Sequence, residues 1–320
     1  MLRRSTQMVQ LRHLAALALL AGCDSAPADS CRSDVDCPGG ACVVGQCRSL
    51  GIDLGDGDGD ASSDLAPGPP PDGAGAADLA ARHDGTAPFC TFNGDGVIER
   101  SEEPFQVGLG ALFAVNQPGA TVAVQLAPKN GTWDFSAPVA NERKQFDQLL
   151  APAGQWWAAA FPTATFAERI DDGQQLYGVF HVGAKSLDLL GVVSDPGVLT
   201  QTELKYDNPI PVLEFPLKQG QSWMASSLAR GVASGVPLLS QDDYQFTVDA
   251  RGKTIVPAGS FDTLRVRMNY TQTIGLLATT RIQYLHVAEC FGSVARIRSK
   301  DNEPSNDFTE AAEYRRLATQ

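Results

Sequence analysis

Aromatic residues are missing from the first 88 positions of this 320-residue chain, because all 24 Phe, Trp and Tyr lie between Phe89 and Tyr314. A segment without aromatic side chains can bury only a small apolar surface. We therefore expect one packed domain of about 215 to 230 residues behind an unfolded acidic leader.

Positive charge is scarce as well, with 25 Lys and Arg against 37 Asp and Glu, a net charge of −12. Residues 24–103 carry 4 basic and 16 acidic side chains, whereas residues 104–320 carry 18 and 21. The acidic excess therefore lies in the leader, and the domain behind it is nearly neutral. Phosphate binding needs a basic surface, so this balance argues against a nucleic-acid partner.

Long hydrophobic runs are also absent from the N-terminal region. The apolar stretch from Leu14 to Ala21 has eight residues, and a membrane-spanning helix needs about 20. It follows Arg3, Arg4 and Arg12, so residues 1–22 are predicted to be an export signal.

The signal ends in Leu20-Ala21-Gly22-Cys23, which resembles the lipobox of bacterial lipoproteins. The resemblance implies that Cys23 is acylated, with palmitate among its acyl chains, and becomes the first residue of the mature chain. The body would then be anchored to a lipid bilayer in the bacterial cell envelope, at the periplasmic face or the cell surface. The alternative is a cleaved secretory signal in which Cys23 is incidental.

Seven cysteines are an odd number for an exported protein, and lipidation of Cys23 leaves six. Four of them are close together in residues 23–50: Cys31, Cys37, Cys42 and Cys47. This segment resembles the small cysteine-rich knots near the N-termini of bacterial surface lipoproteins, which implies Cys31–Cys42 and Cys37–Cys47 bridges. The other connectivities remain open, and so does a metal site, although no His lies nearby and the spacing is not that of zinc ribbons.

Residues 51–88 contain 8 Gly, 5 Pro, 8 Ala and 8 Asp among 38 positions. This composition is typical of a flexible, self-repelling linker. We expect it to hold the folded domain away from the lipid surface.

Residues 89–103 include a segment that resembles an EF-hand or dockerin calcium loop. The matching ligand positions are Thr91, Asn93, Asp95, the Val97 carbonyl, Glu99 and Glu102. Thr91 replaces the usual acidic first ligand, and Pro88 and Pro104 disfavour flanking helices. The resemblance implies a structural calcium ion, and the alternative is a polar turn that leads into the first strand.

Residues 104–320 alternate short apolar runs with Gly, Pro, Asn and Asp, which predicts a mainly β domain with antiparallel strands. The expected strands are 105–115, 121–126, 156–161, 175–182, 186–193, 212–215, 243–250, 264–273, 276–288 and 293–298. Only residues 141–151 have a pattern that favours a helix. About ten strands must curl to bury their apolar face, so we expect a curved sheet, as a half-barrel or sandwich.

Three strings in this domain resemble a family of exported bacterial β proteins of unknown function: Leu213 to Trp223, Ile255 to Arg267 and Phe291 to Ile297. The resemblance implies a curved half-barrel similar to periplasmic lipoprotein carriers. Within these strings we expect Trp223, Phe261, Leu264 and Val266 to be core residues. The family usually closes its last hairpin with small residues, whereas this chain has Cys290, which we pair with Cys90 at the domain entrance.

Catalytic motifs are missing: the chain has no Gly-x-Ser-x-Gly elbow, no His-Glu-x-x-His and no phosphate loop. His181 and His286 are the two histidines of the domain, and we expect both on the polar face of a strand. No catalytic residue is predicted, and the protein is expected not to be an enzyme. A hydrolase built on dispersed carboxylates is the alternative, with Asp171, Asp172, Asp242 and Asp243 as its candidates.

Binding is the expected role of the domain. A concave apolar face could hold a lipid, another hydrophobic ligand or an envelope component, which predicts a continuous cavity lined by aliphatic side chains. The alternative is a surface glycan-binding or adhesion module, in which Trp156 or Trp157 stacks on a polysaccharide. That alternative predicts a solid core with a flat aromatic patch outside.

Overall fold

The computed structural model describes residues 40–43, 46–49, 90–171, 173, 175–198 and 200–319. They belong to two units, divided between Pro69 and Pro70 inside the predicted linker. In the first unit, β1 (Gly40–Val43) and β2 (Gln46–Ser49) form an antiparallel hairpin in which Cys42 lies opposite Cys47. The predicted signal peptide, the lipidation site Cys23, the knot cysteines Cys31 and Cys37, and the linker lie outside the described residues.

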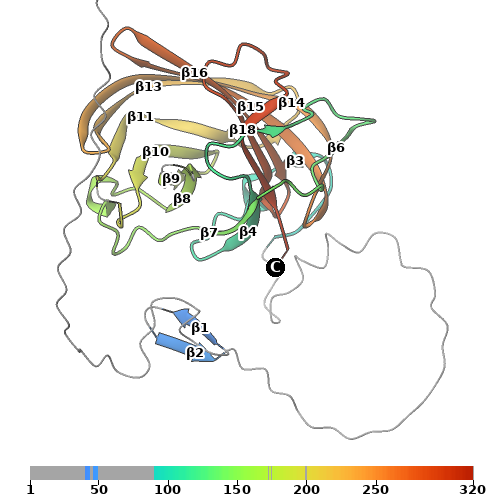
Figure 1. The fold of residues 1–320 in the computed structure, drawn as a ribbon, viewed down its shortest axis with the longest axis horizontal. Coiled ribbons are helices and arrows are strands. Elements are labelled where there is room, and N and C mark those ends of the chain that lie inside the picture. The colour runs from blue at the N-terminus through green and yellow to red at the C-terminus, as the bar shows by residue number, and fades with distance from the viewer. Residues whose placement is uncertain are drawn as a thin grey trace, which may run out of the picture. The chain divides into compact units, whose positions relative to one another are not determined.

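The second unit is built on one large antiparallel sheet (Figure 1). Its main strands follow the spatial order β7-β4-β18-β17-β16-β15-β14-β13-β11-β10-β9-β8. Their bounds are β4 (Gly110–Val115), β7 (Arg143–Gln148), β8 (Phe166–Asp171), β9 (Leu176–Val182), β10 (Ser186–Ser194), β11 (Glu203–Glu214), β13 (Ser222–Ala233), β14 (Val236–Val256), β15 (Gly259–Ile274), β16 (Leu277–Ala288), β17 (Gly292–Ser299) and β18 (Glu310–Leu317).

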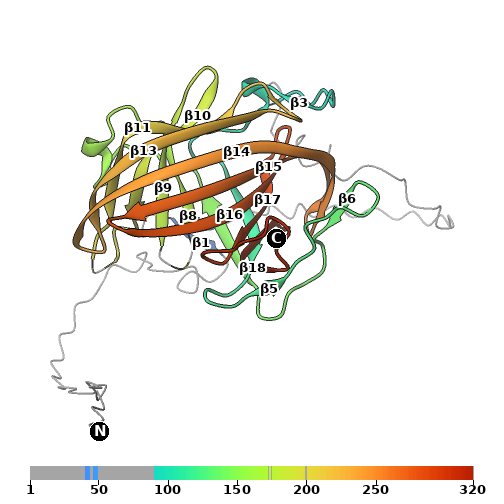
Figure 2. The ribbon, with the colours of Figure 1, turned by 90° about the horizontal axis from the view of Figure 1, so that it is seen from above.

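Short elements flank this sheet. β5 (Val122–Ala123) pairs with β18, and β6 (Thr132–Asp134) runs parallel to β14 (Figure 2). A separate pair joins β3 (Val97–Ile98) to β12 (Leu217–Lys218). Two 3-10 turns, η2 (Arg100–Glu102) and η3 (Ala158–Ala160), are the helical elements in the described ranges.

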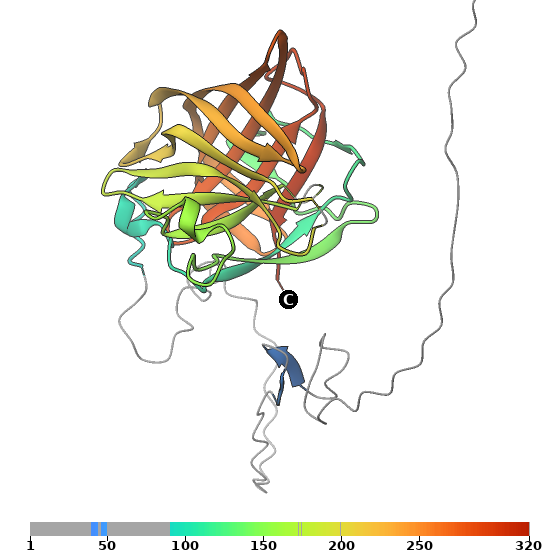
Figure 3. The same cartoon turned by 90° about the vertical axis from the view of Figure 1, so that its left-hand side faces the viewer.

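The sheet curves until its two end strands, β7 and β8, come together (Figure 3). Just beyond β7, the Leu150 N–H donates to the Ala167 carbonyl at 2.9 Å, and the Ala167 N–H donates to the Leu150 carbonyl at 3.0 Å. The predicted mainly β class and the curved antiparallel sheet are therefore confirmed. The sheet closes further than a half-barrel, and this near-closure leaves little unpaired strand edge.

Alternation along each strand separates the interior face from the exterior face. In β14 the side chains of Asp242, Tyr244 and Phe246 are buried, whereas Asp243 and Gln245 are exposed. The four predicted core residues are all buried: Trp223, Leu264 and Val266 belong to the interior apolar cluster, and Phe261 belongs to a second cluster. Rings stack through this interior: Trp223 lies 5.1 Å from Phe246, between ring centroids.

The exterior face of the sheet is covered in two places by chain outside the main strands. Residues 116–142 cover strands β14 to β18, where Trp133 and Phe135 pack against Tyr284 and Ile297. Residues 151–164 cover β8 to β10, where Trp157 and Phe161 are buried. The domain therefore has apolar clusters on both sides of the sheet.

Two sequence predictions of secondary structure were wrong. The predicted helix at 141–151 is strand β7, because all six of its residues pair with β4 and alternate between the two faces. The predicted strand at 156–161 is a turn followed by η3, because Pro152 and Gly154 reverse the chain and the Gln155 N–H closes on the Pro152 carbonyl at 3.0 Å.

Within the residues that the structure describes, no helix is both long enough and apolar enough to cross a membrane.

Candidate functional site

A cluster of ion pairs lies inside the nearly closed sheet, between β8 on one wall and β17 and β18 on the other. Glu313 accepts from Arg296 Nε at 2.5 Å and from Arg298 Nε at 3.3 Å. Arg298 Nη2 also reaches Asp171 of β8, at 3.2 Å. The two walls are therefore joined across the interior by charged side chains rather than separated by a hollow.

A second part of this interior cluster is centred on Asp147 of β7. Its carboxylate lies 2.7 Å from Arg315 Nη1 and 3.2 Å from Arg169 Nε. The Arg315 guanidinium is also stacked 3.8 Å from the centroid of the Phe113 ring. Burial lowers the pKa of Arg315, and the neighbouring Asp147 counteracts that effect.

Buried carboxylates that are each held by arginine stabilise one geometry of the surrounding strands. The interior cluster therefore explains how β7, β8, β17 and β18 are fixed together. Among the described residues of this cluster, Asp147, Asp171 and Glu313 are each ion-paired with arginine.

Asp242 lies in a separate cluster of hydroxyl groups inside the sheet and is only 2% exposed. Its carboxylate accepts from Tyr206 Oη and Tyr270 Oη, both at 3.0 Å, and from Ser240 Oγ at 2.8 Å. Burial, and secondarily the adjacent charge, raise the pKa of Tyr206 well above its usual value, so its hydroxyl remains a donor. These hydrogen bonds satisfy a carboxylate that water does not reach.

The four carboxylates named as hydrolase candidates do not form one site among the residues described. Asp171 is ion-paired with Arg298, Asp242 is held by the tyrosines, and Asp243 points to the opposite, exposed face of β14, where it accepts from Ser226 Oγ at 2.6 Å. Asp172 lies outside the described residues. Adjacent strand residues face opposite sides, so Asp242 and Asp243 cannot act together.

The two domain histidines differ in their surroundings. His181 is partly exposed, and its Nδ1 lies 2.8 Å from the Thr163 carbonyl oxygen. His286 is fully buried, with Nδ1 2.8 Å from Thr254 Oγ1. The prediction that His286 lies on a polar face was wrong, because residues 116–142 cover that face of β16.

Burial, and secondarily the nearby Arg265, lower the pKa of His286 to about 3. Its ring packs edge-on against Trp133, at 4.8 Å between centroids, and against Phe135 at 5.2 Å. His286 is therefore a neutral core residue at neutral pH.

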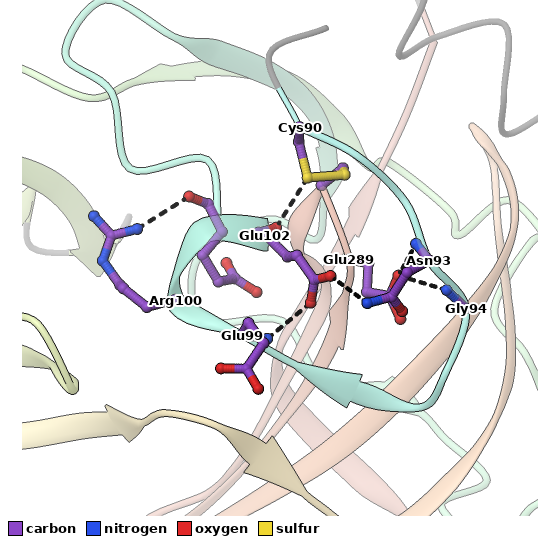
Figure 4. The surroundings of a disulfide bond; sticks show 9 residues. Cys90, Asn93, Gly94, Glu99, Arg100, Glu102 and Glu289 are labelled. Carbon is purple, nitrogen blue, oxygen red and sulfur yellow. Dashed lines mark hydrogen bonds between the residues drawn. A yellow bond between two sulfur atoms is a disulfide. The ribbon is translucent and has the colours of Figure 1, made fainter.

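The chain enters the domain through residues 90–105, named here the entrance segment (Figure 4). Cys90 forms a disulfide with Cys290, as the sequence analysis expected, with 5.5 Å between the Cα atoms. The Cys290 N–H donates to the Glu102 carbonyl at 2.7 Å. The bridge therefore fixes the entrance segment to the turn between β16 and β17.

The proposed calcium ligands lie in this segment, and the side-chain oxygens of three of them accept hydrogen bonds. Asn93 Oδ1 accepts from the Asp95 N–H at 2.9 Å, and Asp95 Oδ1 accepts from the Val97 N–H at 2.7 Å. The Glu102 carboxylate accepts from Asn93 Nδ2 at 2.7 Å and from the Glu99 N–H at 2.8 Å. Thr91 and Glu99 are exposed.

β3 lies inside the twelve-residue stretch, and the 3-10 turn η2 stands where the exiting helix of an EF-hand would begin. In the described part of the chain no three His, Cys, Asp or Glu side chains are grouped so that they could hold a metal ion. The arrangement is that of a hydrogen-bonded polar turn, and calcium binding at Thr91 to Glu102 stays a prediction.

Two acidic residues beside this turn were not singled out from the sequence. Glu289 Oε2 accepts from the N–H groups of Asn93 at 3.1 Å and Gly94 at 3.0 Å (Figure 4). Glu103 is 5% exposed, and neither of its carboxyl oxygens has a hydrogen-bond partner. Burial raises the pKa of Glu103 to about 8, with Arg100 opposing the shift and Glu168 adding to it.

A groove of about 600 Å³ opens on the surface where β10 begins and β11 ends. It is lined by Lys185, Ser186, Asp188, Pro211, Glu214, Phe215, Pro216, Lys218 and Gln221. A much smaller hollow of about 10 Å³ lies beside the entrance segment. Neither of these two is the enclosed aliphatic cavity that a lipid carrier would need.

The tryptophan pair does not form a flat outer platform. Trp157 is 3% exposed, and Trp156 is partly buried with its Nε1 3.4 Å from the Ser194 carbonyl oxygen. Both belong to the apolar cluster under residues 151–164. The surface groove is therefore a better candidate for a binding site than these two indoles.

No protein-family model matches the chain, and no curated protein sequence matches it. Membership in the exported β family therefore stays a prediction. A crystal structure at 2.70 Å resolution of a "putative lipoprotein" from Parabacteroides distasonis aligns with 67% of this chain and 96% of its own, at 13% identity and a TM-score of 0.29. A TM-score of that size carries no argument about fold or function.

Proposed function

We propose that this protein is a non-catalytic, lipid-anchored protein of the bacterial cell envelope whose β domain binds an envelope component in the surface groove. The anchor rests on the lipobox at Cys23. The observation that carries the binding role is an open groove of about 600 Å³ on a domain whose interior is filled by stacked rings and ion pairs.

The lining of the groove favours a polar ligand. It presents two ammonium groups, Lys185 and Lys218, and two carboxylates, Asp188 and Glu214, beside apolar residues such as Pro216. The Gln221 amide is already hydrogen-bonded to the backbone of Glu214 and Lys218. A balanced set of donors and acceptors suits a hydroxyl-rich polymer better than an acyl chain, because an acyl chain would leave these groups desolvated and unpaired. An envelope polysaccharide is therefore the proposed partner.

Co-sedimentation of the purified chain with insoluble envelope polysaccharide tests this role. We expect saturable binding that weakens about 100-fold in the Lys185→Ala/Lys218→Ala variant, since each of the two lost charged hydrogen bonds costs about 1.5 kcal/mol. A matched control is Lys129→Ala/Lys253→Ala, which removes two ammonium groups from elsewhere on the domain. Equal binding by the two variants would contradict the assignment of the binding site to the groove.

The hydrophobic-ligand hypothesis has its own readout in the same preparation. Saturable uptake of one apolar fluorescent probe per chain, unaffected by the groove variant, would replace the proposed polysaccharide role with that of a lipid carrier.

A further inference from the structure

Large apolar side chains are exposed at the ends of two hairpins, β13–β14 and β15–β16. Leu276 is fully exposed, Leu277 is 77% exposed, Val236 is 64% exposed and Leu239 is 54% exposed. Val232 and Ile274, at the same ends, are also exposed. We name these two hairpin ends, residues 231–241 and 271–280, the apolar tips.

Both tips lie at the same end of β14 and β15. These neighbouring strands pair as far as Gln241 opposite Thr273, which is one residue before Ile274 but five residues from the start of β14 at Val236 (Figure 2). The β13–β14 hairpin therefore extends further than the β15–β16 hairpin, and each presents exposed apolar side chains at this end of the sheet.

The tip segments themselves carry no charged side chain. Residues 231–241 and 271–280 contain no Asp, Glu, Lys or Arg. Of the charges that adjoin them along the chain, Asp242 is buried, and Arg230 and Arg281 are paired with Asp207 and Asp301. Glu203 of β11 lies opposite Val232 at the border of the tips. Nothing in the tips themselves would have to be neutralised or left unpaired in a medium of low dielectric constant.

The hairpin backbone also suits partial burial in such a medium. β13 and β14 are paired from Ser222 opposite Thr247 up to Ala233 opposite Val236, and β15 and β16 are paired up to Ile274 opposite Leu277. Most backbone donors and acceptors are therefore satisfied within the hairpins, so the apolar side chains can leave water without stranding many peptide groups.

The chain itself supplies the partner. The predicted lipid attachment at Cys23 precedes the entrance segment by 66 residues, 24–89. Residues 31–49 of this stretch contain the predicted knot and the β1–β2 hairpin, and the other 47 residues, fully extended, reach about 155 Å. This length exceeds the size of a domain with a radius of gyration of about 17 Å. Every face of the domain can thus meet the bilayer that carries the anchor, and the tips are its uncharged apolar face.

We propose that the apolar tips insert into the acyl boundary of the lipid bilayer and give the domain a second, non-covalent membrane contact beside the acylated Cys23. The proposal shares the lipid anchor with the proposed function but not the groove. Once the anchor holds the domain at the surface, even a weak contact is populated because its local concentration is high.

Short-range quenching by brominated lipids tests this contact in the acylated full chain. The chain is placed in nanodiscs of phosphatidylethanolamine and phosphatidylglycerol, with and without brominated acyl chains. The reporter is Leu276→Trp, and the matched control is Phe146→Trp, because Phe146 is 61% exposed on β7, outside the tips. We expect the fluorescence added by Leu276→Trp to fall at least twofold with bromination and that added by Phe146→Trp to stay unchanged.

Equal quenching of the two reporters, or none at Leu276→Trp, would overturn the proposal. A blue shift of the Leu276→Trp emission that grows with protein concentration in the absence of lipid would overturn it in favour of a second copy of this chain as the partner. Polysaccharide binding is measured on the same preparation, because it tests the groove and not the tips. The Lys185→Ala/Lys218→Ala variant has native tips, so a loss of polysaccharide binding and a loss of quenching can be told apart.

Discussion

The two ends of the sheet are built in opposite ways, although β14, β15 and β16 run through both. At one end the entrance segment covers the strands, with the Cys90–Cys290 bridge and three acidic residues, Glu102, Glu103 and Glu289, each less than 9% exposed. At the other end the apolar tips are uncovered and carry no charge. Covalent and electrostatic constraints are concentrated at the covered end, which leaves the tips free for contact with a partner.

Among the changes that test this comparison of the two ends, removal of the disulfide at the covered end is expected to lower the stability most. The bridge closes a loop with a sequence separation of 200 residues, and disulfides typically stabilise by about 2–4 kcal/mol. Cys90→Ala, Cys290→Ala and the double variant should each lower the melting temperature by about 5–15 °C. Thermal melting monitored by circular dichroism checks this, and a double variant much less stable than either single one would mean that the cysteines contribute separately.

The buried carboxyl of Glu103 should make the covered end sensitive to pH. Its pKa rises from 4.5 to about 8 on folding, so the folded state binds more protons between these values. Stability from this group is therefore complete below pH 4.5 and is lost as pH rises through 8, at about 1.4 kcal/mol per pH unit.

Glu103→Gln should remove this contribution to the pH dependence of the free energy of unfolding, and it should stabilise the domain at pH 8. Urea unfolding between pH 5 and pH 8 measures it, with Glu310→Gln as the control because Glu310 is exposed. Parallel slopes for the native chain and Glu103→Gln would show that the carboxyl reaches water.

The smallest effect is expected at the tips. Leu276→Ala should change the free energy of unfolding by less than about 0.5 kcal/mol, because the side chain is exposed. Leu264→Ala is the matched change at a site that is 2% exposed and should cost about 2–5 kcal/mol. Chemical denaturation of both variants checks the contrast, and a comparable loss at Leu276 would mean that the tips belong to the core.

Several strands could be predicted from local apolar runs. The expected strands 175–182, 186–193 and 264–273 correspond to β9, β10 and most of β15. Strands β7, β8, β13 and β18 were not predicted. In β7 and β18 the buried positions include Asp147, Glu313 and Arg315, whereas the alternation rule assumes an apolar interior.

The residues of the candidate sites also differ in whether the sequence predicts them. The Cys90–Cys290 pair could be expected from a count of cysteines, whereas Glu289 and Glu103 carry no local pattern that marks them. Their roles depend on which segment covers them. His286 shows the same limit, since its polar-face assignment failed when residues 116–142 packed over β16.

By itself, the sequence determined the mainly β class, the acidic leader, the lipobox at Cys23 and the residues that anchor the core, because composition and local spacing encode these properties. The tertiary structure decided that the sheet nearly closes, that arginines and carboxylates fill part of its interior, and that the uncharged tips of two hairpins lie at the same end of the sheet. Each of these depends on contacts between strands far apart in the chain, and local spacing does not specify such contacts.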